Sequence, residues 1–334
     1  MNILIIKLAA IGDVIRTTSI LPGLREKFPD CSIAWVTKKE SLDILKNNGL
    51  IQNVVAIENI KNDFDDEKLD LIISLDDDYD ACKLAAGIKS KKLIGAYLKN
   101  GKAAYTEDSS LWFDMGLISK FGKERADRLK AENKKTYQEI MYKILNLKYK
   151  TQEPVLVLGR KELEFGKKFA KSNGIENQKI VIGINTGAGG RWQDKKLSIG
   201  ETAELIGRLK KIENAKLLLF GGPEEKDRNK KIISLAKKDL IDAGTDNSLL
   251  EFAALVNLCD VLVTSDSLAM HIGTALKKKV VAFFYPTSAA EIELYSRGIK
   301  IIGKGKDYCS YKTKCHSPPK WDMDGIVNAV KSLI

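Results

Sequence analysis

Long hydrophobic runs are missing from this chain of 334 residues. Its apolar runs, such as those at residues 216–220 and 280–285, are far shorter than the roughly 20 apolar residues that a transmembrane helix needs. The first residues carry no basic stretch ahead of their apolar run, and the chain reaches Asp13 too soon for a secretory signal peptide. We therefore expect a cytoplasmic protein.

Signatures of nucleic-acid-binding modules are also missing, although the chain is basic. Lys and Arg number 55 against 44 Asp and Glu, which gives a formal net charge of +11. A lysine-rich solvated surface explains this balance, and so does attraction to an anionic membrane face or a phosphorylated substrate. Because no recognised module accompanies the charge, we expect no nucleic-acid partner.

Cysteines are few and odd in number, five in all. Cys31, Cys82 and Cys259 stand in apolar contexts, which is typical of reduced, buried thiols in a cytosolic protein. Only Cys309 and Cys315 are close neighbours. Together with His316 they could ligate zinc, but no fourth ligand is evident, so thiols without a metal are the favoured alternative.

Short apolar runs alternate with amphipathic stretches along the whole chain, which is typical of parallel α/β architecture. The predicted strands are residues 3–6, 32–37, 54–57, 71–75 and 93–95, and then 180–185, 216–220, 261–264 and 280–284. After the first strand, apolar residues recur at helical spacing up to Phe28 and predict a helix. Pro22 predicts a kink or a break within that helix.

Two such series imply two domains, which we expect at residues 1–153 and 154–334. They would form two open sheets facing across a cleft. In sheets of this kind ligands bind at the carboxyl ends of the strands. The loops at those ends are therefore the candidate sites.

The first of these loops is residues 9–13. Gly12 permits a tight turn, and Asp13 stands where a helix N-cap is expected. Asp13 is either a plain cap or a general base that points into the cleft. A helix N-terminus favours the ionised carboxylate, which suits a reaction in which an acceptor hydroxyl loses its proton late.

The second loop, residues 185–192, contains three glycines and a cation. Glycines let backbone amides approach a phosphate, which Arg191 could neutralise. The spacing is not GxGxxG, and no acidic residue follows at the end of the next strand. A dinucleotide site is therefore disfavoured.

The third loop, residues 220–227, has a Gly-Gly-Pro turn followed by Glu224 and Glu225. Acidic residues at a helix start stabilise it electrostatically. Alternatively, one of the two carboxylates accepts hydrogen bonds from a ribose, as acidic residues do in other nucleotide-binding folds.

The fourth loop, residues 264–271, places small hydroxylated residues at a helix start, which is typical of an anion site. His271 follows Ser267 by one turn on the same face. It could reach the same ligand, or it could be purely structural.

A cluster of carboxylates at residues 76–80 is a rival site. It could bind Mg²⁺ and a sugar diphosphate. The alternative is a solvated acidic turn whose members, Asp76 among them, touch acceptor hydroxyls. We favour the second interpretation because the phosphate-binding features lie in the other half of the chain.

Taken together, the four loops resemble those of glycosyltransferase family 9, the heptosyltransferases. The resemblance runs nearly the whole length; it is strongest at residues 6–14 and 264–275 and weakest between about 97 and 150. It implies GT-B architecture, in which an N-terminal Rossmann-like domain binds the acceptor and a C-terminal one binds the nucleotide sugar. It also implies inverting, metal-free transfer of heptose from an ADP-sugar to the inner core of lipopolysaccharide, with no cofactor beside the donor.

The resemblance implies a role for individual residues. Asp13 would be the base, and Lys7 and Asp76 would bind the acceptor. The residues implied for the donor are Thr186, Gly187 and Arg191 at the diphosphate, Glu225 at the ribose, Asn247 beside adenine, and Asp266, Ser267 and His271 along the sugar and phosphates.

Three departures from the family pattern stand out. Leu268 replaces a common glycine, and Gln193 replaces the proline often found after the tryptophan. The segment 309–316 is similar to a cysteine-rich segment of some relatives, with fewer cysteines.

The implied partners are a nucleotide-sugar donor and an anionic glycolipid acceptor at the cytoplasmic face of the inner membrane, where peripheral contact is an open question. Two alternatives remain. One is a nucleotide-sugar epimerase of the same architecture, and the other is a non-catalytic basic protein that binds polyanions or membranes.

Overall fold

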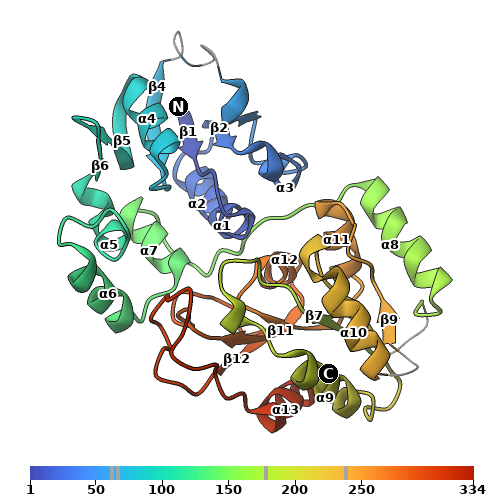
Figure 1. Ribbon diagram of the computed structural model, residues 1–334. Coiled ribbons are helices and arrows are strands. Elements are labelled where there is room, and N and C mark those ends of the chain that lie inside the picture. The colour runs from blue at the N-terminus through green and yellow to red at the C-terminus, as the bar shows by residue number, and fades with distance from the viewer. Residues whose placement is uncertain (61–63, 65–67, 177–179, 237–239) are drawn as a thin grey trace. The chain divides into compact units, whose positions relative to one another are not determined.

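The computed structural model describes residues 1–60, 64, 68–176, 180–236 and 240–334 (Figure 1). The chain divides into two compact units. The first comprises Met1–Val157 together with Ala290–Glu293, and the second comprises Leu158–Ala289 and Leu294–Ile334. The short segment Ala290–Glu293 thus belongs to the first unit, although the sequence on both sides of it belongs to the second.

The first unit is built on a sheet with the strand order β3-β2-β1-β4-β5-β6. Only β6 runs antiparallel to its neighbour among the strands described there. The strands are β1 (Asn2–Ile6), β2 (Ser32–Thr37), β3 (Asn53–Ala56), β4 (Leu69–Ser74), β5 (Ser90–Lys99) and β6 (Lys102–Tyr105). The five predicted strands are confirmed, while β6 was not predicted.

The helices of the first unit follow these strands. They are α1 (Ile11–Thr17), α2 (Ile20–Lys27), α3 (Leu42–Leu45), α4 (Tyr79–Gly87), α5 (Ser110–Phe113), α6 (Lys123–Glu132) and α7 (Tyr137–Ile144). The break expected from Pro22 is confirmed, since Thr18 and Ser19 separate α1 from α2. Pro22 lies in the first turn of α2, where its missing N–H leaves no intrahelical bond unmade.

The second unit contains a fully parallel sheet in the order β12-β11-β10-β7-β8-β9. Its strands are β7 (Ile180–Asn185), β8 (Ala215–Phe220), β9 (Leu240–Asp242), β10 (Val261–Ser265), β11 (Lys279–Phe284) and β12 (Gly298–Ile302). Four of them were predicted. The others, β9 and β12, lie at the two edges of the sheet.

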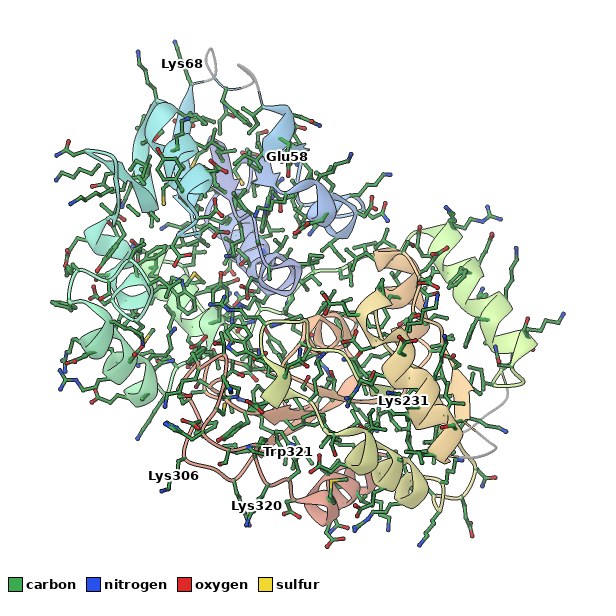
Figure 2. The ribbon with its side chains drawn as sticks, viewed as in Figure 1. Glu58, Lys68, Lys231, Lys306, Lys320 and Trp321 are labelled. Atoms are coloured by element: carbon green, nitrogen blue, oxygen red, sulfur yellow. The ribbon has the colours of Figure 1, made fainter. Side chains whose placement is uncertain are left out.

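Helices cover both faces of this second sheet (Figure 1). They are α8 (Arg160–Ser172), α9 (Ile199–Leu209), α10 (Lys226–Ala236), α11 (Leu249–Val256), α12 (Leu268–Ala275) and α13 (Met323–Leu333). On one face α9, α10 and α13 pack against alternate strand residues such as Val261 and Val263. On the other, a Cβ added to Gly273 of α12 would lie 2.8 Å from Leu262, so this glycine lets α12 approach the sheet closely. Trp321, which is labelled in Figure 2, precedes α13. Its ring packs edge-on against that of Phe283, with 5.2 Å between the ring centres.

Both sheets reverse their strand order at one point, between β1 and β4 in the first and between β7 and β10 in the second. A crevice opens at the carboxyl ends of the strands at such a point, and ligands bind there. The predicted α/β class with two Rossmann-like sheets, as in GT-B proteins, is therefore confirmed. Among the residues described, no helix has the length and apolar character needed to cross a membrane.

Gly95 fixes the position of β5 beside the end of β4. It pairs with Ser74 in the parallel ladder and has a φ of +116°. A Cβ at this position would lie 1.8 Å from the Ser74 carbonyl oxygen. Because Asp76 lies two residues after Ser74, this close approach also helps to position the loop that carries Asp76.

We expect Gly95→Ala to lower the free energy of unfolding by about 3 kcal/mol or more, because the backbone clash adds to the cost of the φ angle. Gly101→Ala is the matched control. Its φ is +74° with no atom within 4 Å of the added Cβ, so a cost of about 1–2 kcal/mol is expected. Urea unfolding measures both, and equal losses would show that contact with Ser74 does not constrain β5.

Candidate functional site

Four loops at the carboxyl ends of β7, β8, β9 and β10 surround one cavity of about 430 Å³, which lies within the second unit. That volume suits a ligand of nucleotide size. The lining residues are Asn185, Gly187, Ala188, Gly189, Gly221, Gly222, Pro223, Glu224, Glu225, Thr245, Asn247, Leu249, Phe252, Ser267, Leu268 and Ala269. Apolar and polar side chains both contribute, as a ligand with a flat base and charged groups requires.

The N-terminus of α12 borders this cavity. Ser267 is the N-cap residue, but its hydroxyl makes no capping bond. It lies instead 3.0 Å from the Thr264 hydroxyl and 3.3 Å from Asn185 Nδ2. Leu268 and Ala269, the first helical residues, line the cavity. Their amides belong to the turn that lacks intrahelical partners, so this end of α12 can bind an anion.

Glu225 is buried at the wall of the cavity, where two glycines make room for it. Its Oε1 lies 2.9 Å from Lys196 Nζ, and its Oε2 accepts the Gly222 N–H at 3.1 Å. A Cβ on Gly187 would lie 2.9 Å from Oε2, and a Cβ on Gly221 would lie 2.8 Å from the Glu225 Cβ. The glycines thus allow a carboxylate, as well as a ligand, to approach the loop backbone.

Lys195 forms a second buried ion pair beside the cavity loops. Its Nζ lies 2.8 Å from Asp266 Oδ2, which also accepts a bond from the Thr287 hydroxyl at 2.7 Å. Burial alone would raise the pKa of Asp266, but attraction to Lys195 and His271 outweighs burial and lowers it. Lys195 also lies 4.6 Å from the ring of Trp192. This cationic site was missed from the sequence, where Arg191 drew attention because it directly follows the glycines.

Of the eight residues predicted for the donor, four line the cavity: Gly187, Glu225, Asn247 and Ser267. The remaining four, Thr186, Arg191, Asp266 and His271, are not among its lining residues. The Thr186 hydroxyl is buried 2.6 Å from Asn229 Oδ1, so it supports the loop from beneath. Arg191 is exposed, and its guanidinium lies 4.5 Å from the Trp192 ring.

Asp13 lies at the carboxyl end of β1 in the first unit, but not as a helix cap. The N-cap of α1 is Ala10, whose carbonyl accepts the Val14 N–H at 3.0 Å, and Asp13 is the third helical residue. The N-cap interpretation was therefore wrong, because the loop after β1 is one turn shorter than expected. The Asp13 side chain is 33% exposed and pairs with Arg16 Nε at 3.0 Å.

Lys7 and Asp76 come together close to Asp13, as a buried pair with 3.1 Å between Nζ and Oδ2. The same Asp76 oxygen accepts the amides of Leu8 and Ala9 at 2.9 and 3.2 Å. Burial alone would lower the pKa of Lys7, but attraction to Asp76 and Asp13 outweighs it and raises the pKa. Asp76 thus braces the loop after β1, and Lys7 stays charged.

The other carboxylates of the acidic cluster at residues 76–80 differ in their surroundings. Asp78 caps α4 by accepting the Asp80 amide at 2.9 Å. Asp77 is half-buried, and burial, together with its neighbour Asp76, raises its pKa. In the described part of the chain, no three His, Cys, Asp or Glu side chains are grouped as metal ligands.

The C-terminal cysteine segment is organised around a carboxylate. Asp307 is buried and accepts bonds from the His316 amide at 2.6 Å and from Lys312 Nζ at 2.9 Å. His316 Nδ1 lies 2.9 Å from the same carboxylate, and the Cys315 amide donates to Asp194 at 3.2 Å. The segment is thus held by hydrogen bonds to Asp307 and Asp194, and among the described residues no three His, Cys, Asp or Glu side chains are placed together to hold a metal ion there.

Comparison with known proteins was made at the level of sequence families and of solved structures. The sequence model described as "Glycosyltransferase family 9 (heptosyltransferase)" matches residues 63–320. No curated protein sequence gives a significant match.

Solved structures with a similar fold cover almost the whole chain. A family 9 glycosyltransferase from Veillonella parvula has a TM-score of 0.79 at 19% identity, covering 99% of this chain and 96% of its own. The E. coli ADP-heptose LPS heptosyltransferase II has a TM-score of 0.68 at 17% identity, and the match covers 100% of this chain and 98% of that one. The E. coli heptosyltransferase WaaC, solved with ADP, has a TM-score of 0.66 at 14% identity, and the match covers 100% of both chains. These likenesses agree with the two Rossmann-like sheets. The family match, which spans well over half of the chain, identifies the protein as a member of glycosyltransferase family 9.

Proposed function

We propose that this enzyme transfers heptose from an ADP-heptose donor to an anionic glycolipid of the lipopolysaccharide inner-core type, with inversion and without a metal ion. The cavity of the second unit, with the start of α12 and a buried glutamate at its wall, carries this proposal. Two E. coli WaaC structures, one with ADP and one with ADP-2-deoxy-2-fluoro heptose, support the choice of donor.

The chemistry of the cavity suggests how such a donor would be bound. The diphosphate would accept bonds from the first amides of α12, with Lys195 and Arg191 supplying positive charge. Glu225 would accept bonds from the ribose hydroxyls, as acidic residues do in other nucleotide folds. Phe252 and Asn247 would contact the base. His271, which interacts with Asp266, would act on the sugar or the phosphates by way of that carboxylate. Thr186 would keep the loop at residues 185–192 in place.

The reaction that we propose is a single displacement. The acceptor oxygen forms a bond to the anomeric carbon on the face opposite the diphosphate, and the bond from that carbon to the diphosphate oxygen breaks. The negative charge on the departing diphosphate is stabilised by the helix amides and Lys195. Asp13 takes the acceptor proton, and Lys7 contacts the acceptor while Asp76 keeps it in place.

An acceptor-dependence assay tests the function itself. Incubated with ADP-heptose alone, the enzyme is expected to leave the sugar unchanged, and with lipopolysaccharide core acceptor it is expected to release ADP. Conversion of the nucleotide sugar into an epimer without acceptor would overturn transfer in favour of the epimerase alternative. Absence of any nucleotide binding would favour the polyanion-binding alternative, against which family membership already argues.

Donor binding should depend on Lys195 more than on Arg191. Lys195 is buried beside the cavity loops, whereas Arg191 is exposed. We expect Lys195→Gln to weaken ADP binding by about 1.5–3 kcal/mol, and Arg191→Ala by less than about 1 kcal/mol. Calorimetric titration of ADP measures both, with EDTA present to exclude a metal contribution. The reverse order would move the diphosphate toward Arg191, and loss of binding in EDTA would revive the cluster at residues 76–80.

Asp13→Asn should separate chemistry from binding. Asparagine cannot act as a carboxylate base, so we expect turnover to fall by roughly 10²–10⁴-fold. Because Asp13 does not cap α1 and its ion pair is partly exposed, the loss of stability should stay below about 1 kcal/mol. Melting temperature, ADP affinity and turnover are measured on one preparation. Wild-type turnover in this variant would remove Asp13 from the mechanism.

A turn before α6 supports peripheral contact with an anionic membrane. Leu117 and Phe121 are 85% and 53% exposed. The turn is nonetheless ordered, since Tyr105 accepts the Lys120 amide at 3.0 Å and bonds to Asp114. Residues 117–135 contain seven Lys or Arg against three Asp or Glu. Apolar anchors within a basic segment are typical of a surface that binds anionic lipid.

Vesicle sedimentation tests this surface. We expect binding to phosphatidylcholine vesicles only when they contain phosphatidylglycerol, with roughly tenfold or greater loss of binding in the variant Leu117→Ser, Phe121→Ser. Leu163→Ser, on the exposed side of α8, is the control and should bind like the wild type. Equal binding by all three proteins would show that the overall charge, and not this turn, attracts the lipid.

A further inference from the structure

Glu291 enters the first unit on the short segment Ala290–Glu293, which the chain inserts there between β11 and β12. Its carbonyl accepts the N–H of Tyr137 at 2.9 Å. Tyr137 is the first residue of α7, so this bond satisfies an amide that has no partner within its helix. The backbone of Glu291 is thereby fixed beside α7, and its side chain is only 10% exposed.

The Glu291 carboxylate lies 3.8 Å from Nη1 of Arg16, the residue that pairs with Asp13 at 3.0 Å. Arg16 is itself 12% exposed, and its guanidinium lies 4.1 Å from the centre of the Tyr137 ring. The Tyr137 hydroxyl in turn lies 2.7 Å from the Thr17 hydroxyl. The guanidinium therefore rests on a fixed aromatic surface between two carboxylates.

The other charges around Asp13 favour its ionised form. Lys7 stays protonated, and Asp13 is one of the carboxylates that raise the pKa of Lys7. Asp76 is bound to Lys7 at 3.1 Å. Two cations, Arg16 and Lys7, thus act on Asp13. The helix that carries Asp13, α1, also contacts α3 and the short 3-10 helix Lys39–Ser41 before it. The residues that these two elements bury are Ser41, Ile44 and Leu45, none of which carries a charge.

A carboxylate that is held too strongly by cations is a poor proton acceptor, because proton transfer to it becomes unfavourable. We infer that Glu291 is a positioning residue that shares Arg16 with Asp13 and thereby keeps Asp13 basic enough to accept a proton. The inference rests on the proposed function in one respect, namely that Asp13 is the base. It adds to that function a residue more than 270 positions away in the sequence, on a segment that the sequence analysis did not single out.

Two substitutions shift the charge on Asp13 in opposite directions. Glu291→Gln removes a negative charge and leaves Arg16 wholly to Asp13, so the pKa of Asp13 should fall by about 0.5–1 unit. Arg16→Gln removes the attracting cation, so the pKa of Asp13 should rise by a similar amount of about 0.5–1 unit. The acidic limb of the kcat/KM profile should therefore move to lower pH in the first variant and to higher pH in the second. Plateau turnover of Glu291→Gln should fall about threefold, because the base is weaker.

Glu58→Gln serves as the control, since Glu58 is an exposed glutamate of the same unit (Figure 2). It should leave the acidic limb where the wild type has it. A carbon-13 NMR titration of the Asp13 carboxyl group, assigned with Asp13→Asn, follows the same shifts without any need for activity. Opposite shifts in the two variants, by titration and in the pH profile, support the positioning role.

Lower melting temperatures without opposite shifts would overturn it and leave Glu291 as a purely structural contact. Opposite shifts in the NMR titration, combined with wild-type turnover of Asp13→Asn, would support the coupling of Glu291 to Asp13 but refute Asp13 as the base. The two failures are thus distinguishable.

Discussion

The reversal of strand order in each sheet is the constraint on which both candidate sites depend. The reversal lies between β1 and β4 in the first sheet and between β7 and β10 in the second. The loops that follow the two strands of each pair lead to opposite sides of the sheet, which leaves a crevice between them at the carboxyl ends. Loops that carry small and charged residues can meet there without disturbing the core below. In the second unit these loops surround the cavity, and in the first they bring Lys7, Asp13 and Asp76 together. The buried strands supply the apolar core, and the loops at their ends supply the polar groups of both candidate sites.

Buried ion pairs then hold those loops in place. Lys195 with Asp266, Lys196 with Glu225, and Lys7 with Asp76 each join residues from different strand ends. Such pairs contribute little net stability, because removing two charges from water nearly offsets their attraction. Their value lies in geometry. A cation and a carboxylate that are already oriented need not reorganise when a diphosphate leaves or a hydroxyl loses its proton.

The strands that are buried on both faces could be predicted from the sequence. Features that depend on contacts between distant parts of the chain could not. Central strands are continuous apolar runs because both of their faces are covered, and all nine predicted strands exist. The missed strands β6, β9 and β12 lie at sheet edges, where short or half-exposed segments lose that signal. Gly187 was expected to admit a phosphate and Gly221 to form a turn, but the close contact of both with Glu225 is visible only when the two loops are seen together. For the same reason Lys195, whose partner Asp266 lies 71 residues away, was not predicted from the sequence.

Asp13 illustrates most clearly why a residue type in a loop does not settle its chemistry. As an N-cap it would have served the helix, and its replacement by any good cap would have been harmless. As the third helical residue it instead interacts with Lys7, which directly follows β1, and with Arg16 of its own helix. Arg16 in turn lies near Glu291, on the segment between β11 and β12. Whether such a carboxylate acts as a base depends on the sum of these charges and not on any one of them. In the role that we infer for Glu291, two cations alone would make Asp13 a weaker proton acceptor, and a second carboxylate on the same guanidinium would restore part of its basicity. In the proposed mechanism, the basicity of Asp13 therefore depends on a group of four side chains that only the folded chain assembles.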